Sequence, residues 1–223
     1  MGDTAIKHRE LPTLTARRIA FALAAMAVIM SPFDRAAADD RISFRHDVMP
    51  VLIKSGCTAG ACHGNLNGKG GLKLSLRGED PAYDLGKLKR EQMGRRVNTL
   101  DPAASLILRK ATATIPHEGG QRFKLDSPEY RTLHQWVAQG ARDDDKDLPS
   151  LVKLEVEPRE VVLTEPKTSV QLRVTATFSD GKSRDVTTMA VYELSNLSAT
   201  VSHAGLVERV KAGLRRAQAK DGT

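Results

Sequence analysis

The sequence predicts two domains of different class, a mainly α-helical domain followed by an all-β sandwich, behind an N-terminal export signal. Up to residue 142, apolar residues recur at helical spacing behind Asp-Pro and Ser-Pro start signals. From residue 151 onwards they alternate with polar residues. A charged segment that ends in Pro149-Ser150 separates the two patterns. We therefore expect a signal peptide at 1–38, a helical domain at 39–142, a linker at 143–150, a β domain at 151–213 and a polar tail at 214–223.

The N-terminus has the composition of a secretory signal. Lys7, Arg9, Arg17 and Arg18 precede an uninterrupted apolar run at 19–30, and the small residues Ala36-Ala37-Ala38 follow it. The run is shorter than the roughly 20 residues that a membrane-spanning helix needs. We expect an exported protein, periplasmic or at the cell surface, that contacts the membrane only if the signal stays uncleaved.

The charge of the chain argues for a solvated surface and against nucleic-acid binding. Loss of residues 1–38 removes five of the 34 basic and three of the 27 acidic residues, so the net charge falls from +7 to +5 (29 against 24). Basic and acidic residues are interspersed, and aromatic residues make up only 4% of the chain. A protein with so few aromatic side chains has little to stack on bases.

The first predicted helix leads directly into the cysteine-containing segment. Phe44, Val48, Leu52 and Ile53 recur at helical spacing, and the pattern stops at Gly56. We expect Asp47 to cap this helix, with Pro50 tolerated in its first turn.

Three further helices are predicted from their start signals. Asp80-Pro81 begins a helix that we expect to reach about Met93, and Asp101-Pro102 begins one that reaches about Lys110. Ser127-Pro128 begins the last helix, which stops at Gly140. That helix places four apolar residues on one face: Tyr130, Leu133, Trp136 and Val137.

The segment between the first two helices is expected to be irregular. Residues 64–71 contain four glycines, too many for regular structure. Leu72, Leu74 and Leu76 then alternate with polar residues, which predicts a short strand or an extended segment.

The C-terminal half has the period-two pattern of short strands. We expect strands at Val152–Val156 and Val170–Phe178, with a hairpin turn at Ser179–Lys182. Further strands are expected at Val191–Leu194, Thr200–Ser202 and Leu206–Val210. Regular short strands of this kind indicate a sandwich. Asp180 and Asp185 are read as turn and strand-edge residues, not as a calcium pair.

The segment Gly56–Gly64 contains both cysteines of the chain, Cys57 and Cys62, with His63 directly after the second. A c-type haem needs two thiols that add to the porphyrin vinyl groups and an imidazole on the iron. The usual spacer is two residues and this one has four. Gly60 and its small neighbours make a bulge sterically cheap. A local disulfide and two free structural thiols fit the same spacing, whereas zinc normally takes four Cys or His ligands.

A second axial ligand is sought among the histidines and methionines of the helical domain. His117 lies in a loop between Pro116 and Gly119-Gly120, where a side chain is free to face a metal centre. It is the leading candidate, and Met93 is the alternative because a thioether is the other common ligand. His134 lies in the last helix beside its apolar face, and His46 has no distinguishing context.

Residues 44–142 resemble the planctomycete-type cytochrome c domain. The matching segments are Asp47–Leu52, Gly56-Cys57 through Cys62-His63-Gly64, Gly71–Gly78, Gly94–Val97, and Asp126–Tyr130 through Trp136 to Gly140-Ala141. The resemblance implies a class I cytochrome c-like fold in which Cys57 and Cys62 hold one covalent haem c and His63 is the proximal ligand. Many such domains have Met-Pro-Pro before the last helix, where this chain has Ile115-Pro116-His117. This departure implies ligation of the iron by two histidines and a lower reduction potential.

Residues 151–213 resemble a bacterial Ig-like domain of group 2. The matching segments are Phe178–Gly181, Arg184–Thr187, Val201-Ser202 and Gly205–Val207. The resemblance implies a spacer or interaction role. The chain after Gly213 is polar beyond Leu214, where such a domain should have a closing apolar strand. We therefore expect a truncated product of a longer protein, with an incomplete sandwich.

Together these features predict an exported electron-transfer module and not an enzyme. Iron with both axial positions filled has no open site for oxygen activation or peroxidase turnover. The expected partner is a redox protein of unknown identity. The alternative is a cell-surface binding protein in which Cys57 and Cys62 form a disulfide and the Ig-like part contacts a partner or glycan.

Overall fold

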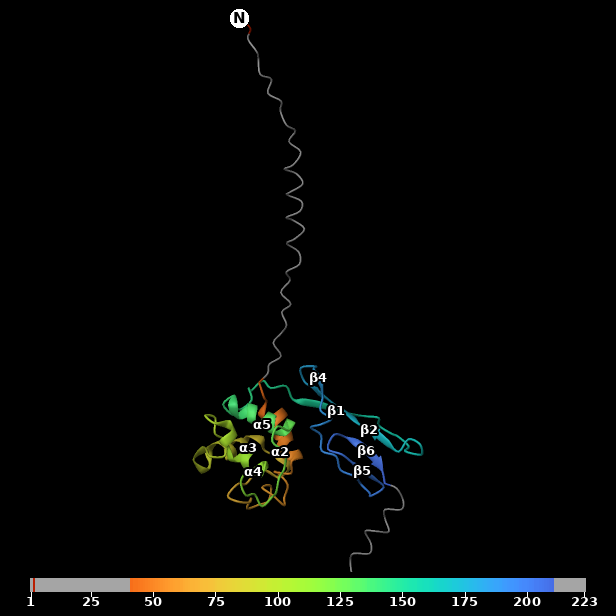
Figure 1. The fold of residues 1–223 in the computed structure, drawn as a ribbon, viewed down its shortest axis with the longest axis horizontal. Helices are drawn as coiled ribbons and strands as arrows, with labels where there is room; N and C mark the ends of the chain where they lie inside the picture. The colour runs from red at the N-terminus through yellow and green to blue at the C-terminus, as the bar shows by residue number, and fades with distance from the viewer. Residues whose placement is uncertain (1, 3–40, 211–223) are drawn as a thin grey trace, which may run out of the picture. The chain divides into compact units, whose positions relative to one another are not determined.

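We describe a computed structural model of the chain, which places Gly2 and residues 41–210 (Figure 1). The rest of the predicted signal and the polar tail lie outside the described residues. The chain divides between Asp40 and Arg41, and residues 41–210 lie within one unit. This part of the chain combines a few helices with small antiparallel sheets, 27% helix and 18% strand, and so has mixed α/β character. Within it, no helix has the length and apolar composition needed to cross a membrane.

Within residues 41–210, all helices precede residue 139. The α-helices are α2 (Met49–Lys54), α3 (Pro81–Arg90), α4 (Leu106–Ala111) and α5 (Pro128–Ala138). A π-helical turn η1 (Phe44–Val48) runs into α2, and three short 3-10 turns are η2 (Leu76–Gly78), η3 (Gln92–Gly94) and η4 (Pro102–Ala104).

The first helical segment begins one turn earlier than we predicted. Ser43, not Asp47, is the capping residue, because its hydroxyl accepts the backbone N–H of His46 at 2.9 Å. The Asp47 carboxylate accepts the N–H of Ser43 at 2.9 Å. The Ser43 hydroxyl thus satisfies the N–H of His46 and the Asp47 carboxylate satisfies that of Ser43, an arrangement like a capping box with its acidic residue one position later.

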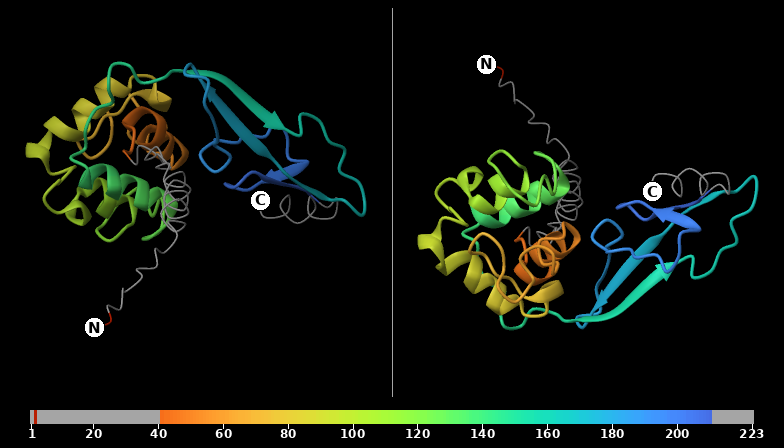
Figure 2. Two further views of the ribbon diagram at one scale, coloured as in Figure 1. Left: turned by 90° about the horizontal axis from the view of Figure 1, so that it is seen from above. Right: turned by 90° about the horizontal axis from the view of Figure 1, so that it is seen from below.

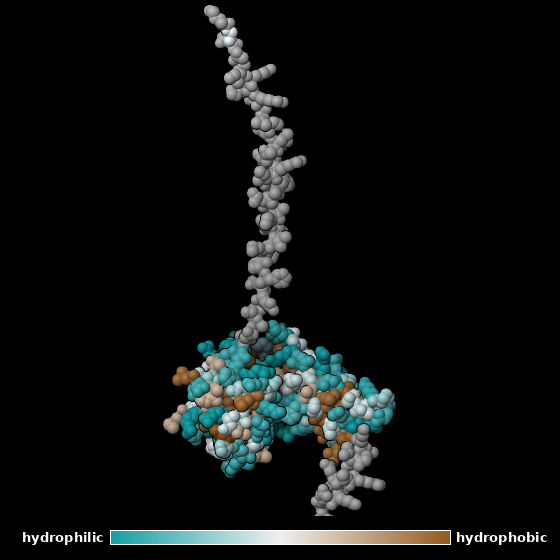
Figure 3. Space-filling view, in the orientation of Figure 1, coloured by the Kyte–Doolittle hydropathy of each residue, from teal (hydrophilic) through white to brown (hydrophobic). Residues whose placement is uncertain are grey.

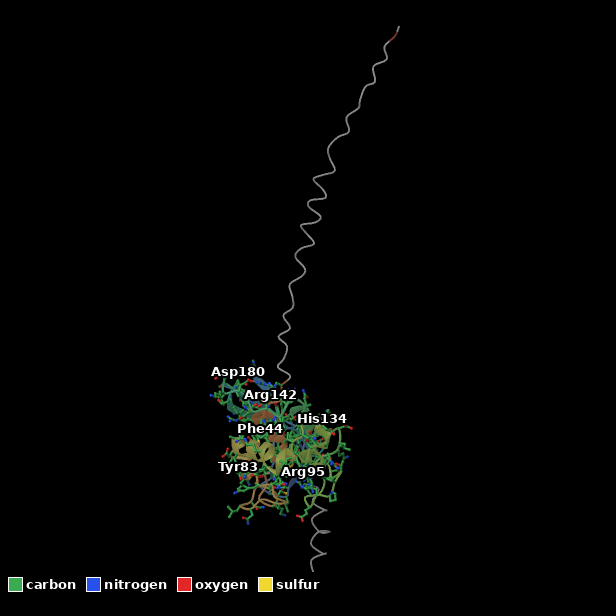
Figure 4. All side chains as sticks on the ribbon, turned by 90° about the vertical axis from the view of Figure 1, so that its left-hand side faces the viewer. Phe44, Tyr83, Arg95, His134, Arg142 and Asp180 are labelled. Atoms are coloured by element: carbon green, nitrogen blue, oxygen red, sulfur yellow. The ribbon has the colours of Figure 1, made fainter. Side chains whose placement is uncertain are left out.

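The last helix matches the prediction from its flanking residues. The Ser127 hydroxyl accepts the N–H of Tyr130, and Gly140 has a φ of +92° directly after the C-cap residue. Leu133, Trp136 and Val137 are no more than 1% exposed. The centroid of the Trp136 ring lies 5.3 Å from that of the Phe44 ring, and Phe44 is labelled in Figure 4. This contact joins the first and last helices in one apolar core.

The start signals of the two helices between these were placed correctly, but neither begins one continuous helix of the predicted length. Asp80 caps α3 as predicted, yet α3 ends at Arg90 and Met93 lies in the separate turn η3. The helix expected from Asp101-Pro102 is broken at Ser105 into η4 and α4. The strand alternative for Leu72–Leu76 is wrong, because the segment has only an isolated bridge at Lys69 and Leu72 and then the turn η2.

In the part of the chain that the structure describes, the strands form two antiparallel sheets of three strands each. One has the order β1-β3-β4 and the other β2-β6-β5. The strands are β1 (Leu151–Glu157), β2 (Ser169–Gln171), β3 (Arg173–Phe178), β4 (Ser183–Asp185), β5 (Ala199–Val201) and β6 (Leu206–Arg209). Residues 143–150 contain no helix or strand.

Two strand predictions need correction. The run Val170–Phe178 is not one strand, because β2 and β3 belong to different sheets and the Leu172 N–H bonds to the carbonyl of Gly205 between them. Val191–Leu194 forms no strand; its side chains are mostly exposed and its backbone pairs with no neighbour in either sheet. The hairpin turn at Ser179–Lys182 is confirmed, since it joins β3 to β4 with Gly181 at a φ of +80°.

Candidate functional site

The end of α2 delivers Cys57 to its position through a Schellman motif. Gly56 has a φ of +73°, its N–H bonds to Ile53, and the N–H of Cys57 bonds to the carbonyl of Leu52. A side chain at Gly56 would adopt a strained conformation and would also meet the guanidinium of Arg122 at 2.5 Å. The prediction that the helix ends at Gly56 is therefore confirmed. Both the positive φ and the close approach of Arg122 favour glycine at this position.

Residues 57–64 form a series of tight turns. The N–H of Cys62 bonds to Ala59, and the N–H of His63 returns to the carbonyl of Cys57 at 3.0 Å. A Cβ at Gly64 would lie 1.9 Å from the backbone oxygen of Thr58, so the chain closes on itself there. We expected Gly60 to permit the bulge, but it has no positive φ, and a Cβ there would meet only the Leu76 side chain, at an ordinary contact distance of 3.7 Å. Glycine is therefore required at Gly56 and Gly64, which flank the two cysteines and His63, and not within the spacer.

Cys57, Cys62, His63 and His117 all line one pocket of about 780 Å³. Pockets of this size hold cofactors and other organic ligands. Most of the remaining lining is apolar, from Leu52, Leu72, Leu74, Leu88, Leu106, Ile107 and Ala111. Three cations also line it, Lys69, Arg96 and Lys110, together with Glu118. The pocket therefore combines an apolar body with a positively charged part.

The two cysteines are free thiols. Both residues are half-buried, and burial raises the pKa of Cys57 to about 11, although nearby Arg122 lowers it in part. The thiol of Cys57 is thus neutral at pH 7. The disulfide that we considered as an alternative is not formed in this structure.

The imidazoles of His63 and His117 are nearly parallel, 15° apart, with centroids 6.3 Å apart. A histidine nitrogen binds a metal at about 2.0–2.1 Å, and the ring centre lies about 1.2 Å behind that nitrogen, so two rings that bind one ion have centroids at most roughly 6.4 Å apart. The observed spacing fits this value. Ordinary ring pairs also occur at such distances, so the hydrogen bonds of the two rings carry more weight than the spacing.

Each ring has its Nδ1 held by backbone oxygen. His63 Nδ1 lies 3.1 Å from the carbonyl of Leu72 and 3.2 Å from that of Lys69, and His117 Nδ1 lies 2.8 Å from that of Gly120. In a neutral imidazole such a bond keeps the proton on Nδ1 and leaves Nε2 as the electron-pair donor. Burial lowers the pKa of His63, and His117 and Arg96 lower it further against the opposing effect of the two carbonyls. The imidazole of His63 is therefore neutral at pH 7.

The loop of His117 is fixed by its neighbours. A Cβ at Gly119 would lie 2.9 Å from the His117 ring, so this glycine is needed for the ring to sit where it does. Lys110 Nζ donates to the carbonyl of Pro116 at 2.6 Å. Arg122 donates from Nη1 to Gly119 at 3.0 Å and from Nε to Ser55 at 2.7 Å.

The other sequence candidates lie elsewhere. Met93 is 92% exposed and is not among the pocket-lining residues. His134, labelled in Figure 4, packs its ring 5.7 Å from Tyr130, and His46 lies 4.8 Å from Phe178. None of the three takes part in the pocket. Within residues 41–210 there is also no cluster of three or more His, Cys, Asp or Glu side chains that could hold a metal ion by themselves.

Sequence reasoning missed Arg96, Arg122, Lys69 and Lys110. Arg96 is 5% exposed and donates to the carbonyl of Lys87 at 2.7 Å and to Glu91 at 2.9 Å. It lies in the segment Gly94–Val97 that we matched to the cytochrome domain, without a role. An arginine that bonds to a residue distant in the sequence leaves no local sequence pattern. Only the three-dimensional arrangement identifies it.

No protein-family model, curated protein or solved structure matches this chain.

Proposed function

We propose that this chain is an exported c-type cytochrome module that binds one haem covalently and transfers electrons to a partner protein. The observation that carries the proposal is the meeting of Cys57, Cys62, His63 and His117 in one apolar pocket, with both imidazoles held at Nδ1. Two side-chain ligands are enough for haem iron, because the porphyrin supplies the other nitrogens. A bare metal ion would need more, and the described residues offer no such cluster.

Each residue has a distinct role in this proposal. Cys57 and Cys62 would form the two thioethers, each by addition of S–H across a vinyl double bond, with the thiol hydrogen ending on the vinyl carbon. His63 and His117 would supply the two side-chain ligands of the iron. Haem bound in this way supplies a reversible one-electron centre. The surrounding leucines keep water from the site, which is one of the means by which a protein sets a reduction potential.

We assign the helical part to a class I cytochrome c-like domain of the planctomycete type, and the strands to a bacterial Ig-like domain. The first assignment rests on the sequence segments named above, supported by the capped helices and by the common core of Phe44 and Trp136. The second rests on the antiparallel pairings of β1 to β6. In this proposal the Ig-like part is a spacer or interaction domain and the chain has no catalytic activity of its own.

The proposal is tested by expression in a cell that attaches c-type haem. Denatured protein on a gel should stain for haem, and native protein should show a visible band that sharpens on reduction and is reversed by an oxidant. The matched control carries Cys57→Ser and Cys62→Ser and should not stain. Colourless wild-type protein from the same cells would end the proposal.

A further inference from the structure

Among the described residues, strand β1 forms one edge of its sheet, and its outer backbone edge is long. It pairs with β3 along six residue pairs, from Leu151 opposite Phe178 to Glu157 opposite Arg173, with an irregularity between Leu151 and Lys153 that leaves Val152 outside the ladder. From Lys153 to Glu157 the register is regular. In the order β1-β3-β4 no described strand lies on its other side, and β1 runs along the outer edge in both views of Figure 2. An edge of this length is a template for pairing with a further strand.

One face of β1 is apolar and exposed. Val152, Leu154 and Val156 alternate along it and are 60%, 54% and 38% exposed. Their neighbours on β3 differ sharply, since Ala176 opposite Leu154 and Val174 opposite Val156 are 2% and 1% exposed. The apolar face therefore continues from a buried strand to an open one. Apolar residues are visible at the surface over the strand region in Figure 3.

The opposite face of β1 is charged in an order that complements itself. It carries Lys153, Glu155 and Glu157. In a symmetric antiparallel pair, one residue lies opposite its own copy, and facing residues share a face of the sheet. Centring the pair on Leu154 sets Lys153 of each copy opposite Glu155 of the other.

Neighbouring registers are unfavourable. Centring on Lys153 or on Glu155 sets two like charges directly opposite each other, and centring on Val156 sets Glu155 opposite Glu157. The register on Leu154 also sets Val152 opposite Val156 twice and Leu154 opposite itself, so the apolar residues meet. Charges on an edge strand usually prevent pairing. Here they disfavour the neighbouring registers and favour the register centred on Leu154.

We propose that β1 pairs with β1 of a second copy of this chain, antiparallel and centred on Leu154, to make a continuous six-stranded sheet. Within one copy, Lys153 Nζ lies 2.8 Å from Glu155, which Arg159 also approaches at 3.4 Å. These side chains are largely solvent-accessible, and such exposed ion pairs contribute little. Lys153 and Glu155 can therefore exchange partners between copies at little cost.

The test exchanges the two charges singly. Lys153→Glu sets a second carboxylate opposite Glu155 of the other copy, and Glu155→Lys sets a second ammonium group opposite Lys153 of the other copy. Either variant alone should be a monomer where the wild type is a dimer, as measured by light scattering on a size-exclusion column over a concentration series. An equimolar mixture of the two variants restores an opposite-charge pair at both positions, so the mixture should double its mass again.

The controls separate dimer loss from misfolding or a general charge effect. Lys182→Glu changes the same charge on the exposed turn between β3 and β4 and should dimerise as the wild type does. Circular dichroism should show the same secondary structure for all variants. A monomeric wild type, single variants that still dimerise, or a mixture that stays monomeric would each overturn the proposal. Single variants that still dimerise would show that another surface joins the two copies. None of these results depends on haem.

Discussion

Arg122 Nε donates a hydrogen bond of 2.7 Å to the carbonyl of Ser55, a residue 67 positions earlier in the chain. Ser55 is the C-cap of α2, two residues before Cys57. The same guanidinium donates to Gly119, next but one to His117. One side chain thus ties the cysteine-containing segment to the loop of His117.

Replacing Arg122 with Gln should loosen the His117 loop without preventing haem attachment. A hydrogen bond from a charged group contributes about 1.5–3 kcal/mol, so the open form of the loop should gain on the order of tenfold or more in population. The measurement is the rate of carbon monoxide binding to the reduced protein, which should rise, with some high-spin character in the oxidised spectrum. Arg109→Gln, at an exposed position of α4, is the control. Carbon monoxide binding as slow as in the wild type would show that Arg122 does not position the ligand.

Replacing His117 with Ala should open the sixth coordination position. The oxidised visible spectrum should change from low spin to high spin, and added imidazole should restore the low-spin form, because the small ligand can replace the missing side chain. His134→Ala, outside the pocket, should leave the spectrum unchanged. A low-spin spectrum that survives the loss of His117 would assign the ligand to another residue, with Met93 next to be replaced.

The thiol of Cys57 should be slow to react in protein made without haem. Burial raises its pKa to about 11 from the ordinary 9.0, so at pH 8 the thiolate fraction is about 100-fold lower than in an unfolded chain. The reaction should accelerate as the pH approaches 11, because a raised pKa delays ionisation to higher pH. Iodoacetamide labelling of the Cys62→Ser variant, followed by mass spectrometry, measures this with the same variant in urea as reference. Equal rates in the folded and unfolded protein would contradict it.

Leu133 lies at the centre of the helical core and is fully buried. Leu133→Ala should lower the free energy of unfolding by about 2–5 kcal/mol, because it removes apolar contacts and leaves a cavity. Denaturant unfolding followed by fluorescence reports this directly, since Trp136 is the single tryptophan of the chain. Gln135→Ala, at an exposed position of the same helix, should change it by less than about 1 kcal/mol. A small effect of Leu133→Ala would mean that the core is not packed as described.

The sequence predicts helix ends well where a side chain or glycine fixes the end locally. Ser127 and Gly140 bound α5 because the cap hydroxyl and the positive φ act within one turn. The Ser43 cap was missed because Asp47 lies in the same turn and is an equally good capping residue type. The division at Leu172 was missed because a period of two shows which face is apolar and not which sheet a strand joins.

The candidate site could be predicted only in part for a similar reason. Cys57, Cys62 and His63 stand together in the sequence, and His117 has an unusual loop context. The structure brings these four residues to one pocket. Arg122 and Arg96 could not be found, because their contacts join segments distant in the chain and arginines elsewhere in this basic sequence look the same.

The measurement that tests the central claim most directly is the intact mass of the denatured, exported protein. Our account predicts a polypeptide that carries the added mass of one haem, retained under denaturing conditions because both thioethers are covalent, and lost when Cys57 and Cys62 are both replaced by Ser. A wild-type mass equal to that of the bare polypeptide, or lower by about two hydrogens as a Cys57–Cys62 disulfide would require, would contradict it.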